Sequence, residues 1–242
     1  MDFSIVIPTY NGAKRLPEVL DSLQGQVGTE GIAWEVLVVD NNSKDETAEV
    51  LSKYAQQWRR DSQLRYLFEA KQGPAYARYC GVKAVKSSSL MGFLDDDNIP
   101  GPNWVAECCA FGRDRPQVGA YGGIIHAKLD NDPPPYFKQV KNYLTIYNRG
   151  NKPFHYQRNA KPRRIPAAPG VVIRKQAWSE AIPPPEKLLI PGRDEKTMAA
   201  GEDAEMMCYG LGSSRESLPD PPFRNRTCDF HRIRLLGTRP LS

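Results

Sequence analysis

Three consecutive acids at the end of an apolar run are the residues of this chain best suited to chemistry. The run 91–94 is followed directly by Asp95, Asp96 and Asp97. Carboxylate oxygens suit hard divalent cations such as Mg²⁺ and Mn²⁺. Adjacent like charges also cost free energy unless a cation or strong donors neutralise them. The pattern predicts a metal-binding loop after a buried strand, and a solvated acidic turn is the alternative interpretation.

Two further polar clusters follow apolar runs earlier in the chain. Pro8, Thr9 and Tyr10 end the first run, and Asp40 ends the second. Because the carboxyl ends of neighbouring parallel strands lie at one edge of a sheet, we expect both clusters to meet the acids in one pocket. The sequence contains neither G-x-G-x-x-G nor G-x-x-x-x-G-K-[ST]. Their absence disfavours an NAD-dependent oxidoreductase and excludes a P-loop NTPase.

An alternation of strands and helices is needed to bring these clusters together, and the hydrophobic patterns predict one. Runs rich in β-branched and aromatic residues indicate strands, and apolar residues spaced three or four apart indicate helices. Ser43 with Glu46 three residues later predicts a helix N-terminus. Predicted strands cover 3–7, 34–39, 64–68, 90–94, 118–125 and 170–174, and predicted helices cover 13–26, 43–60, 74–86 and 103–111. This alternation is typical of an α/β fold with a mostly parallel, doubly wound sheet.

The composition is that of a globular protein. Of the 242 residues, 40% are hydrophobic and 25% are charged. No apolar run reaches the roughly 18 residues of a membrane span, and the N-terminus has no basic and apolar leader, so we expect a cytoplasmic protein. The 5 cysteines show no C-x-x-C spacing, which argues against a zinc site and a disulfide framework.

The positive charge is unevenly distributed. The net charge is +5, and Lys and Arg crowd the segment from Lys138 to Arg174. Such a surface can attract phosphates, anionic polysaccharide or the headgroups at the cytoplasmic face of a membrane, which would give peripheral membrane contact. A solvated basic face is the simpler interpretation. No nucleic-acid-binding motif is present, so nucleic acid is not an expected partner.

Several motifs, in their order and spacing, resemble the family 2 glycosyltransferases of GT-A fold. They are Ser4–Gly12, Glu35–Thr47, Ala77–Val82 and Phe93–Asp97, and the resemblance extends to Gly201–Glu205. It implies a Rossmann-like GT-A sheet flanked by helices and a nucleotide-diphosphate sugar as donor, with a UDP-sugar as the first candidate. It also implies a divalent metal, Mn²⁺ or Mg²⁺. More narrowly, the chain resembles cyanobacterial glycosyltransferases of hormogonium polysaccharide biosynthesis.

The resemblance assigns the donor's nucleobase to the first two strand ends. Pro8, Thr9 and Tyr10 would line the base pocket, and Asp40 would accept the imide N–H of the base. Arg78 would add a cationic contact to the base or a phosphate. Without the resemblance, the first cluster is a strand cap, Asp40 a turn or N-cap residue, and Arg78 a solvated cation.

The acidic residues receive the remaining roles. Asp95 would lie near the ribose, Asp97 would bind the metal that bridges the diphosphate, and Asp96 would support both. Asp203 matches the general base of inverting members, which removes a proton from the acceptor hydroxyl. The alternative is that Glu202 and Asp203 are only favourable charges at a helix N-terminus.

The resemblance divides the chain into three parts. Residues 1–126 would be the nucleotide-sugar-binding half, and 127–209 a Pro-rich acceptor-side lobe that contains the Gly-Glu-Asp motif. Residues 210–242 depart from the family pattern, and we expect this tail to be poorly ordered. Members usually carry a His late in the chain that helps to bind the metal or diphosphate. His231 is either the remnant of that ligand or a surface residue.

The function implied by the resemblance is inverting, metal-dependent transfer of a sugar from a nucleotide-diphosphate sugar to a glycan or lipid-linked acceptor in polysaccharide biosynthesis. A second hypothesis is a nucleotide-sugar-binding protein with little or no transferase activity, because the C-terminus is altered. A third, a nucleotidyltransferase, would favour a Gly-rich basic first loop, which this sequence lacks.

Overall fold

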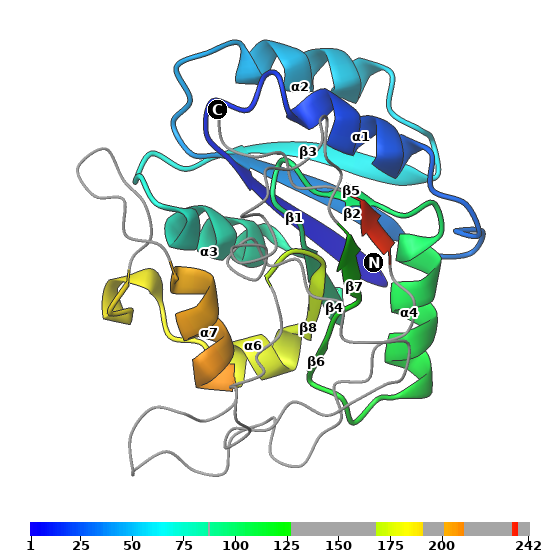
Figure 1. Ribbon diagram of the computed structural model, residues 1–242. Coiled ribbons are helices and arrows are strands. Elements are labelled where there is room, and N and C mark those ends of the chain that lie inside the picture. Colours follow the sequence, from blue (N-terminus) through cyan, green and yellow to red (C-terminus); the bar gives the residue numbers. More distant parts are fainter. Residues whose placement is uncertain (87, 127–167, 191–200, 211–233, 237–242) are drawn as a thin grey trace, which may run out of the picture.

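The computed structural model describes residues 1–86, 88–126, 168–190, 201–210 and 234–236. Its central sheet has six strands. They are β1 (Phe3–Thr9), β2 (Trp34–Asp40), β3 (Ser62–Phe68), β4 (Leu90–Phe93), β6 (Ala120–Tyr121) and β8 (Val171–Arg174). Their spatial order is β3-β2-β1-β4-β8-β6, and β8 runs antiparallel to both of its neighbours (Figure 1). The predicted mostly parallel α/β sheet is confirmed.

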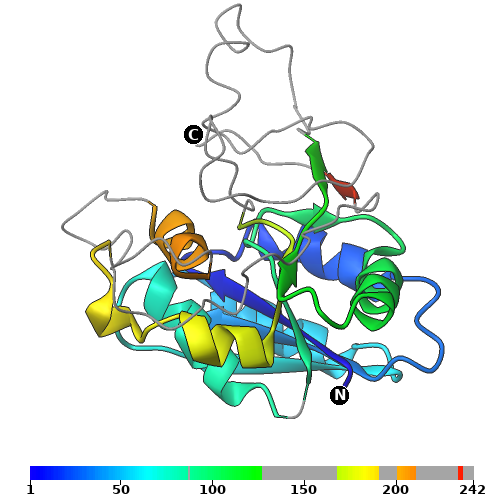
Figure 2. The ribbon, with the colours of Figure 1, turned by 90° about the horizontal axis from the view of Figure 1, so that it is seen from below.

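Helices cover both faces of this sheet, because successive residues of the central strands point to opposite sides. Ile5 and Ile7 of β1 belong to one hydrophobic cluster, and Val6 belongs to the other. The first cluster includes residues of α1 (Leu16–Gln24), α2 (Thr47–Gln56) and α4 (Trp104–Asp114), and the second includes residues of α3 (Pro74–Ala84), α6 (Lys175–Ala181) and α7 (Glu202–Gly210). The result is a three-layer arrangement, seen from below in Figure 2.

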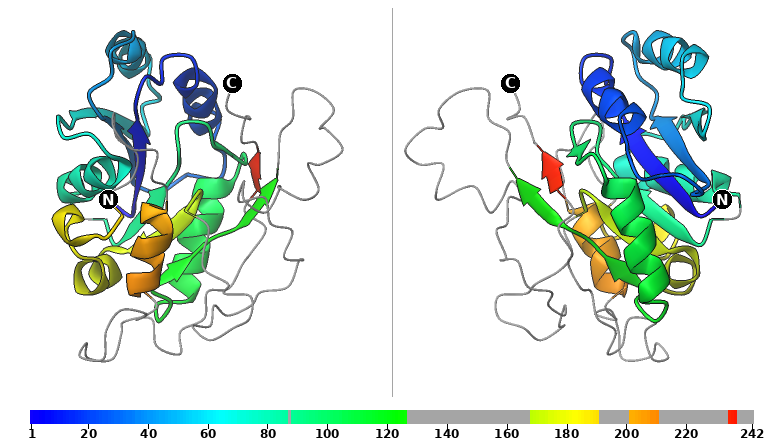
Figure 3. Two further views of the ribbon diagram at one scale, coloured as in Figure 1. Left: turned by 60° about the vertical axis from the view of Figure 1, so that its left-hand side comes forward. Right: turned by 90° about the vertical axis from the view of Figure 1, so that its right-hand side faces the viewer.

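A second, smaller sheet lies beside the first and joins distant parts of the chain. It contains β5 (Ile99–Pro100), β7 (Ile124–His126) and β9 (Arg234–Leu236). β9 lies between the other two, antiparallel to β5 and parallel to β7 (Figure 3). The prediction of one strand over 118–125 was wrong, because the chain leaves the central sheet after Tyr121 and enters the second sheet at Ile124.

The predicted start of the second helix was also wrong. α2 begins at Thr47, and Glu46 rather than Ser43 occupies the N-cap position. The Ser43 hydroxyl instead accepts a hydrogen bond from the backbone N–H of Asn11, at 2.9 Å. Ser43 therefore joins two strand-end loops. Helix α6, which the patterns did not indicate, follows β8 directly.

Parts of the predicted organisation fall on residues outside the described ranges. These are most of the Pro-rich lobe, most of the basic segment from Lys138, and the tail with His231, apart from Gly210 and β9. The three-part division therefore stays a prediction. Within the described ranges, no helix has the length and apolar character that a bilayer span requires.

A buried polar cluster lies where the central strands begin, at the edge opposite the acids. Glu35 of β2 is fully buried. One of its carboxylate oxygens accepts a hydrogen bond from the Ser4 hydroxyl at 2.7 Å, and the other accepts one from Arg65 at 2.8 Å. Ser4 also bonds to the buried Ser88 at 2.6 Å. Each carboxylate oxygen thus has a protein donor, as a buried charge requires.

We expect Glu35→Ala to lower the free energy of unfolding by about 3 kcal/mol, because the Arg65 charge loses its carboxylate partner and the Ser4 hydroxyl loses one hydrogen bond. Urea denaturation measures the change. The control, Glu30→Ala, removes an exposed glutamate and should change stability by less than about 0.5 kcal/mol. Equal losses in the two variants would contradict this prediction.

Candidate active site

The site lies where the order of the central strands reverses. β2 and β3 lie on one side of β1, and β4 lies on the other. In open α/β sheets, ligands bind at the carboxyl ends of the strands at such a point. Here the Thr9 hydroxyl, at the end of β1, donates a hydrogen bond of 2.6 Å to Oδ2 of Asp96, which follows β4. The polar residues at the end of β1 and the acids after β4 are therefore in direct contact.

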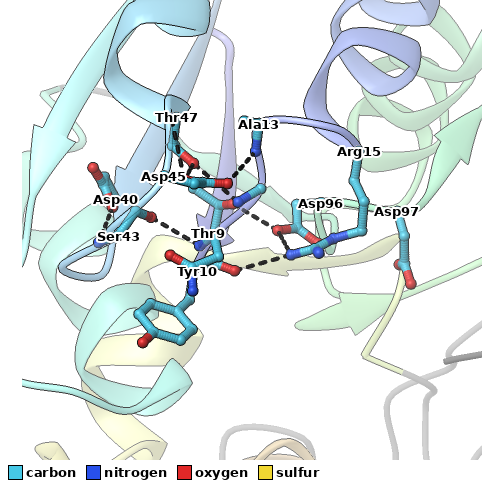
Figure 4. A network of polar contacts seen from close by, with 12 residues as sticks. Thr9, Tyr10, Ala13, Arg15, Asp40, Ser43, Asp45, Thr47, Asp96 and Asp97 are labelled. Carbon is cyan, nitrogen blue, oxygen red and sulfur yellow. Dashed lines mark hydrogen bonds and ion pairs between the residues drawn. The ribbon is translucent and has the colours of Figure 1, made fainter. Parts of the chain in front are cut away.

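Arg15 extends this contact. Its Nε lies 2.8 Å from Oδ1 of Asp96, and one terminal nitrogen lies 2.7 Å from Oδ2 (Figure 4). The same nitrogen donates to the carbonyl oxygen of Tyr10 at 3.0 Å. This hydrogen-bonded ion pair raises the pKa of Arg15. Asp96, which is only 9% exposed, is thereby neutralised by the protein.

Arg78 forms an ion pair with Asp95 and links it to α7. One of its terminal nitrogens donates to Asp95 at 3.0 Å, and the other donates to Glu202 at 2.8 Å. Burial alone would lower the pKa of Arg78, but Asp95, Glu202 and Asp203 together raise it. The contact brings the beginning of α7, where Asp203 lies, close to the acids although more than one hundred residues separate them in sequence.

Among the described residues, no arginine or lysine forms an ion pair with Asp97, whereas Asp96 pairs with Arg15 and Asp95 with Arg78. Its Oδ1 accepts a hydrogen bond of 3.0 Å from the Asn98 side chain. Burial, followed by repulsion from Asp95 and Asp96, raises the pKa of Asp97 to about 7. Arg15 acts in the opposite direction but is outweighed. A carboxylate held in this state gains from a nearby cation.

The acids offer carboxylate oxygens of the kind that hold a divalent cation. In the part of the chain that the structure describes, no three His, Cys, Asp or Glu side chains form a ready metal cage. Arg78 and Arg15 engage Asp95 and Asp96, which leaves Asp97 as the first candidate ligand. Mg²⁺ in proteins is typically held by one or two carboxylates, with phosphate and water completing its shell. The uncompensated charge of Asp97 matches that mode.

Asp40 ends β2, and β1 alone separates that strand from β4. Its side chain is 3% exposed. Oδ1 accepts the backbone N–H of Ser43 at 2.8 Å, and Oδ2 accepts the Tyr66 hydroxyl at 3.0 Å. Burial and this bond to Asp40 raise the pKa of Tyr66 to about 12, so Tyr66 remains a donor. Further lone pairs of the Asp40 carboxylate stay available in principle, and its role toward a base stays a prediction.

The other residues predicted for the base pocket lie at the end of β1, and their role toward a base stays a prediction. Tyr10 is 39% exposed and offers an aromatic surface at the strand end. Pro8 lies within β1 and is buried. Asn11 and Asn42 adopt positive φ angles of 50° and 67°, a conformation that asparagine tolerates better than most residues. These two residues turn the chain sharply after β1 and β2.

Sequence reasoning found the acids and strand ends but missed three residues that organise them. Asn98 is 1% exposed, and its amide accepts the backbone N–H of Asp95 and donates to Asp97, which fixes the turn between them. Glu202 belongs to the acidic motif found in the sequence, but the sequence did not predict its ion pair with Arg78. Arg15 carried no pattern that would single it out, because a lone arginine before a helix is usually solvated.

A comparison with protein-family models identifies the family of this chain. The model described as Glycosyl transferase family 2 matches residues 4–179. The chain belongs to this family. Curated relatives include the glycosyltransferase AglE of Haloferax volcanii, which is 33% identical over 103 residues, or 42% of this chain and 32% of AglE. The matched region of the curated relatives therefore spans a third of their length or less.

Solved structures with the same architecture include two glycosyltransferases. TarS 1–349 of S. aureus has a TM-score of 0.64 at 19% identity, over 98% of this family 2 chain and 60% of that one. The complex of the same TarS fragment with UDP-GlcNAc has a TM-score of 0.62 at 17% identity, over 100% and 59% of the two chains. The mannosyltransferase PcManGT of Pyrobaculum calidifontis, in complex with GDP-Man and Mn²⁺, has a TM-score of 0.53 at 21% identity, over 73% and 45%. At these identities the likeness shows the GT-A-type fold.

Proposed function

We propose that this protein is an inverting, metal-dependent glycosyltransferase. It would move a sugar from a nucleotide-diphosphate sugar, with a UDP-sugar as the first candidate, to a glycan or lipid-linked acceptor in polysaccharide biosynthesis. The observation that carries the proposal is the pair of hydrogen bonds by which Arg78 joins Asp95 to Glu202. That contact brings the candidate general base, Asp203, to the edge of the sheet where the acids lie.

The chemistry requires this proximity. In an inverting transfer, the acceptor oxygen attacks the anomeric carbon while the bond from that carbon to the diphosphate oxygen breaks. A general base takes the proton of the acceptor hydroxyl as the new bond forms. Asp203 follows Glu202 at the start of α7. Its charge raises the pKa of both Arg78 and Asp95, so Asp203 lies near both side chains. It is our candidate for the base.

The leaving nucleoside diphosphate gains negative charge as its bond to the sugar breaks. A divalent cation held by Asp97 would supply electrostatic stabilisation of that charge. Arg78 would hold Asp95 toward the ribose, and Asp96 would act as a support held by Arg15. On the base side, Thr9 and Tyr10 would line the pocket that Asp40 closes.

The relatives support a nucleotide-sugar donor, although they differ in nucleotide. TarS binds UDP-GlcNAc and PcManGT binds GDP-Man with Mn²⁺ in their solved complexes. Uracil and guanine both carry an imide-type N–H that a buried carboxylate such as Asp40 can accept. Membership in the hormogonium polysaccharide subgroup, and a location at the cytoplasmic face of the membrane, remain parts of the proposal that rest on the sequence alone.

Thermal-shift measurements with a panel of nucleotides and nucleotide sugars test the proposal. A ligand that binds only the folded form raises the melting temperature by mass action. We expect UDP, or GDP as the second candidate, to raise it more with MnCl₂ than with EDTA. Release of the nucleoside diphosphate from the matching sugar donor, on addition of an acceptor, would then show transfer.

Two results would speak against the proposal in different ways. If no nucleotide in the panel raised the melting temperature, the protein would have no donor site. Metal-dependent binding without any turnover, across several glycan and lipid-linked acceptors, would support the nucleotide-sugar-binding alternative instead.

A further inference from the structure

The loops after β1 and β2 are fastened to each other by an unbroken series of hydrogen bonds. Three consecutive backbone N–H groups after β1 donate to side chains that follow β2. Asn11 donates to Ser43 at 2.9 Å, Gly12 to Thr47 at 2.9 Å, and Ala13 to Asp45 at 3.1 Å, as Figure 4 shows in part. The loop beside Asp40 therefore cannot shift without moving the loop that begins at Thr9.

Arg15 connects this pair of loops to the acids. Its Nε and one terminal nitrogen donate to the two oxygens of Asp96, and the same terminal nitrogen also donates to the carbonyl oxygen of Tyr10. A planar guanidinium that binds a carboxylate through two parallel bonds fixes orientation as well as distance. A second hydrogen bond, from the Thr9 hydroxyl to Asp96, also joins the end of β1 to the acids.

The backbone of Gly12 packs closely against the hydrogen bond between Thr9 and Asp96. A Cβ atom added at Gly12 would lie 2.0 Å from the Thr9 hydroxyl oxygen and 2.9 Å from Oδ2 of Asp96. The Thr9–Asp96 bond thus passes directly over the glycine backbone, which is possible only without a side chain there. Asp96, with three donors on its two oxygens, is committed to this structure and is poorly suited to bind a ligand itself.

We propose that Arg15 is a positioning residue that couples nucleotide binding to metal binding. The inference rests on the proposed function, in which the loops after β1 and β2 hold the nucleobase and Asp97 holds the cation. A nucleotide that orders the loops also orders Arg15. Arg15 in turn fixes Asp96, and with it the position of the neighbouring Asp97. Binding of either ligand therefore prepares the site for the other.

Equilibrium titration with UDP tests the coupling, with GDP as a parallel probe. The coupling factor is the dissociation constant of the nucleotide in EDTA divided by its value in MnCl₂, and linkage requires the same factor for the effect of the nucleotide on manganese binding. In Arg15→Gln we expect this factor to fall by about tenfold or more, the range seen when groups that orient metal ligands are lost. The metal-free affinity for UDP should stay within about twofold.

Two further variants distinguish positioning from a general loss of structure. Arg15→Lys keeps the charge but not the pair of parallel bonds, so its coupling factor should be intermediate, and it carries the test if Arg15→Gln does not fold. The double variant Arg15→Gln with Asp96→Asn should lose no more coupling than Arg15→Gln alone, because the two residues act as one unit.

A matched control exists at the opposite edge of the sheet. Arg59 also contacts both oxygens of an aspartate, Asp61, near the start of β3. Arg59→Gln should change the melting temperature without changing the coupling factor. A folded Arg15→Gln variant, or in its absence Arg15→Lys, with the wild-type coupling factor would overturn the inference while leaving the proposed function intact. Failure of the wild-type protein to bind any nucleotide would overturn both.

Discussion

Asp203→Asn should lower kcat by at least about a hundredfold and leave the affinity for the donor nucleotide within about twofold. An asparagine amide cannot accept the proton of the acceptor hydroxyl, and general bases typically contribute about 10²- to 10⁴-fold in rate. The substitution also removes a negative charge that acts on Asp95 and Arg78. Repulsion of the diphosphate therefore cannot increase, and donor binding should survive. Steady-state transfer rates and nucleotide titrations together measure this separation.

A conservative variant gives a second test of the same role. Asp203→Glu, which retains a base on a longer side chain, should be impaired less than Asp203→Asn. Asp114→Asn is the control, since it makes the same chemical change at the exposed end of α4. Nearly full kcat in Asp203→Asn would show that the base lies elsewhere.

Asp97→Asn should have opposite effects on activity and on stability. Loss of the candidate metal ligand should lower manganese-dependent kcat/KM by about 10²- to 10³-fold, since electrostatic help from a metal is worth several kcal/mol. In metal-free protein at pH 8, however, the variant should melt at a higher temperature than the wild type, by on the order of 5 °C. The reason is that folding buries the Asp97 charge and places it near two other carboxylates, and an asparagine removes that cost.

The sign follows from the direction of the pKa shift. Folding raises the pKa of Asp97 from 3.8 to about 7, first by burial and then by repulsion from Asp95 and Asp96. Between these values the folded state holds a proton that the unfolded state has released, so wild-type stability falls as the pH rises from about 4 to about 7. Below that window the penalty is absent, and above it the penalty is constant. The asparagine variant lacks this contribution at every pH.

Melting temperatures of wild type and Asp97→Asn in EDTA, across this pH range, measure the difference. The two curves should converge near pH 4 and separate toward pH 8. Asp61→Asn provides a control of opposite sign, because hydrogen bonding by Arg59 lowers the pKa of the exposed Asp61 carboxyl. Its small effect should be destabilising at neutral pH. Curves for Asp97→Asn and wild type that stay parallel at all pH values would refute the assignment of the shift to Asp97.

The two arginines explain why a run of three acids can exist at this rim. Arg15 and Arg78 each take one member of the run, Asp96 and Asp95 respectively. Burial still raises the pKa of Asp95 despite Arg78, and burial with repulsion from the other two acids raises the pKa of Asp97 to about 7. Among the three acids, Asp97 alone lacks an arginine partner in the described part of the chain, which makes it the first candidate to bind a cation.

Some features of the protein could be predicted from the sequence because they depend on neighbouring residues. β-branched runs specify strands, and helical spacing of apolar residues specifies the helices between them. Since strands joined by helices run parallel, the chemistry at the ends of β1, β2 and β4 had to face one edge. The identity of the strand-end residues also carried the family resemblance. The sequence thus determined the class of fold and which residues could form a site.

Tertiary structure alone decided how those residues pair. The position of β4 beside β1 brings Thr9 to Asp96, and no local propensity encodes strand order. The contacts of Arg15 with Asp96, and of Arg78 with Glu202, join residues 81 and 124 positions apart. Ion pairs of this kind depend on where packed elements place the ends of long side chains, and on the burial that strengthens their fields. That is why the acids were visible in the sequence, while the arginines that leave only one of them uncompensated became visible in the fold.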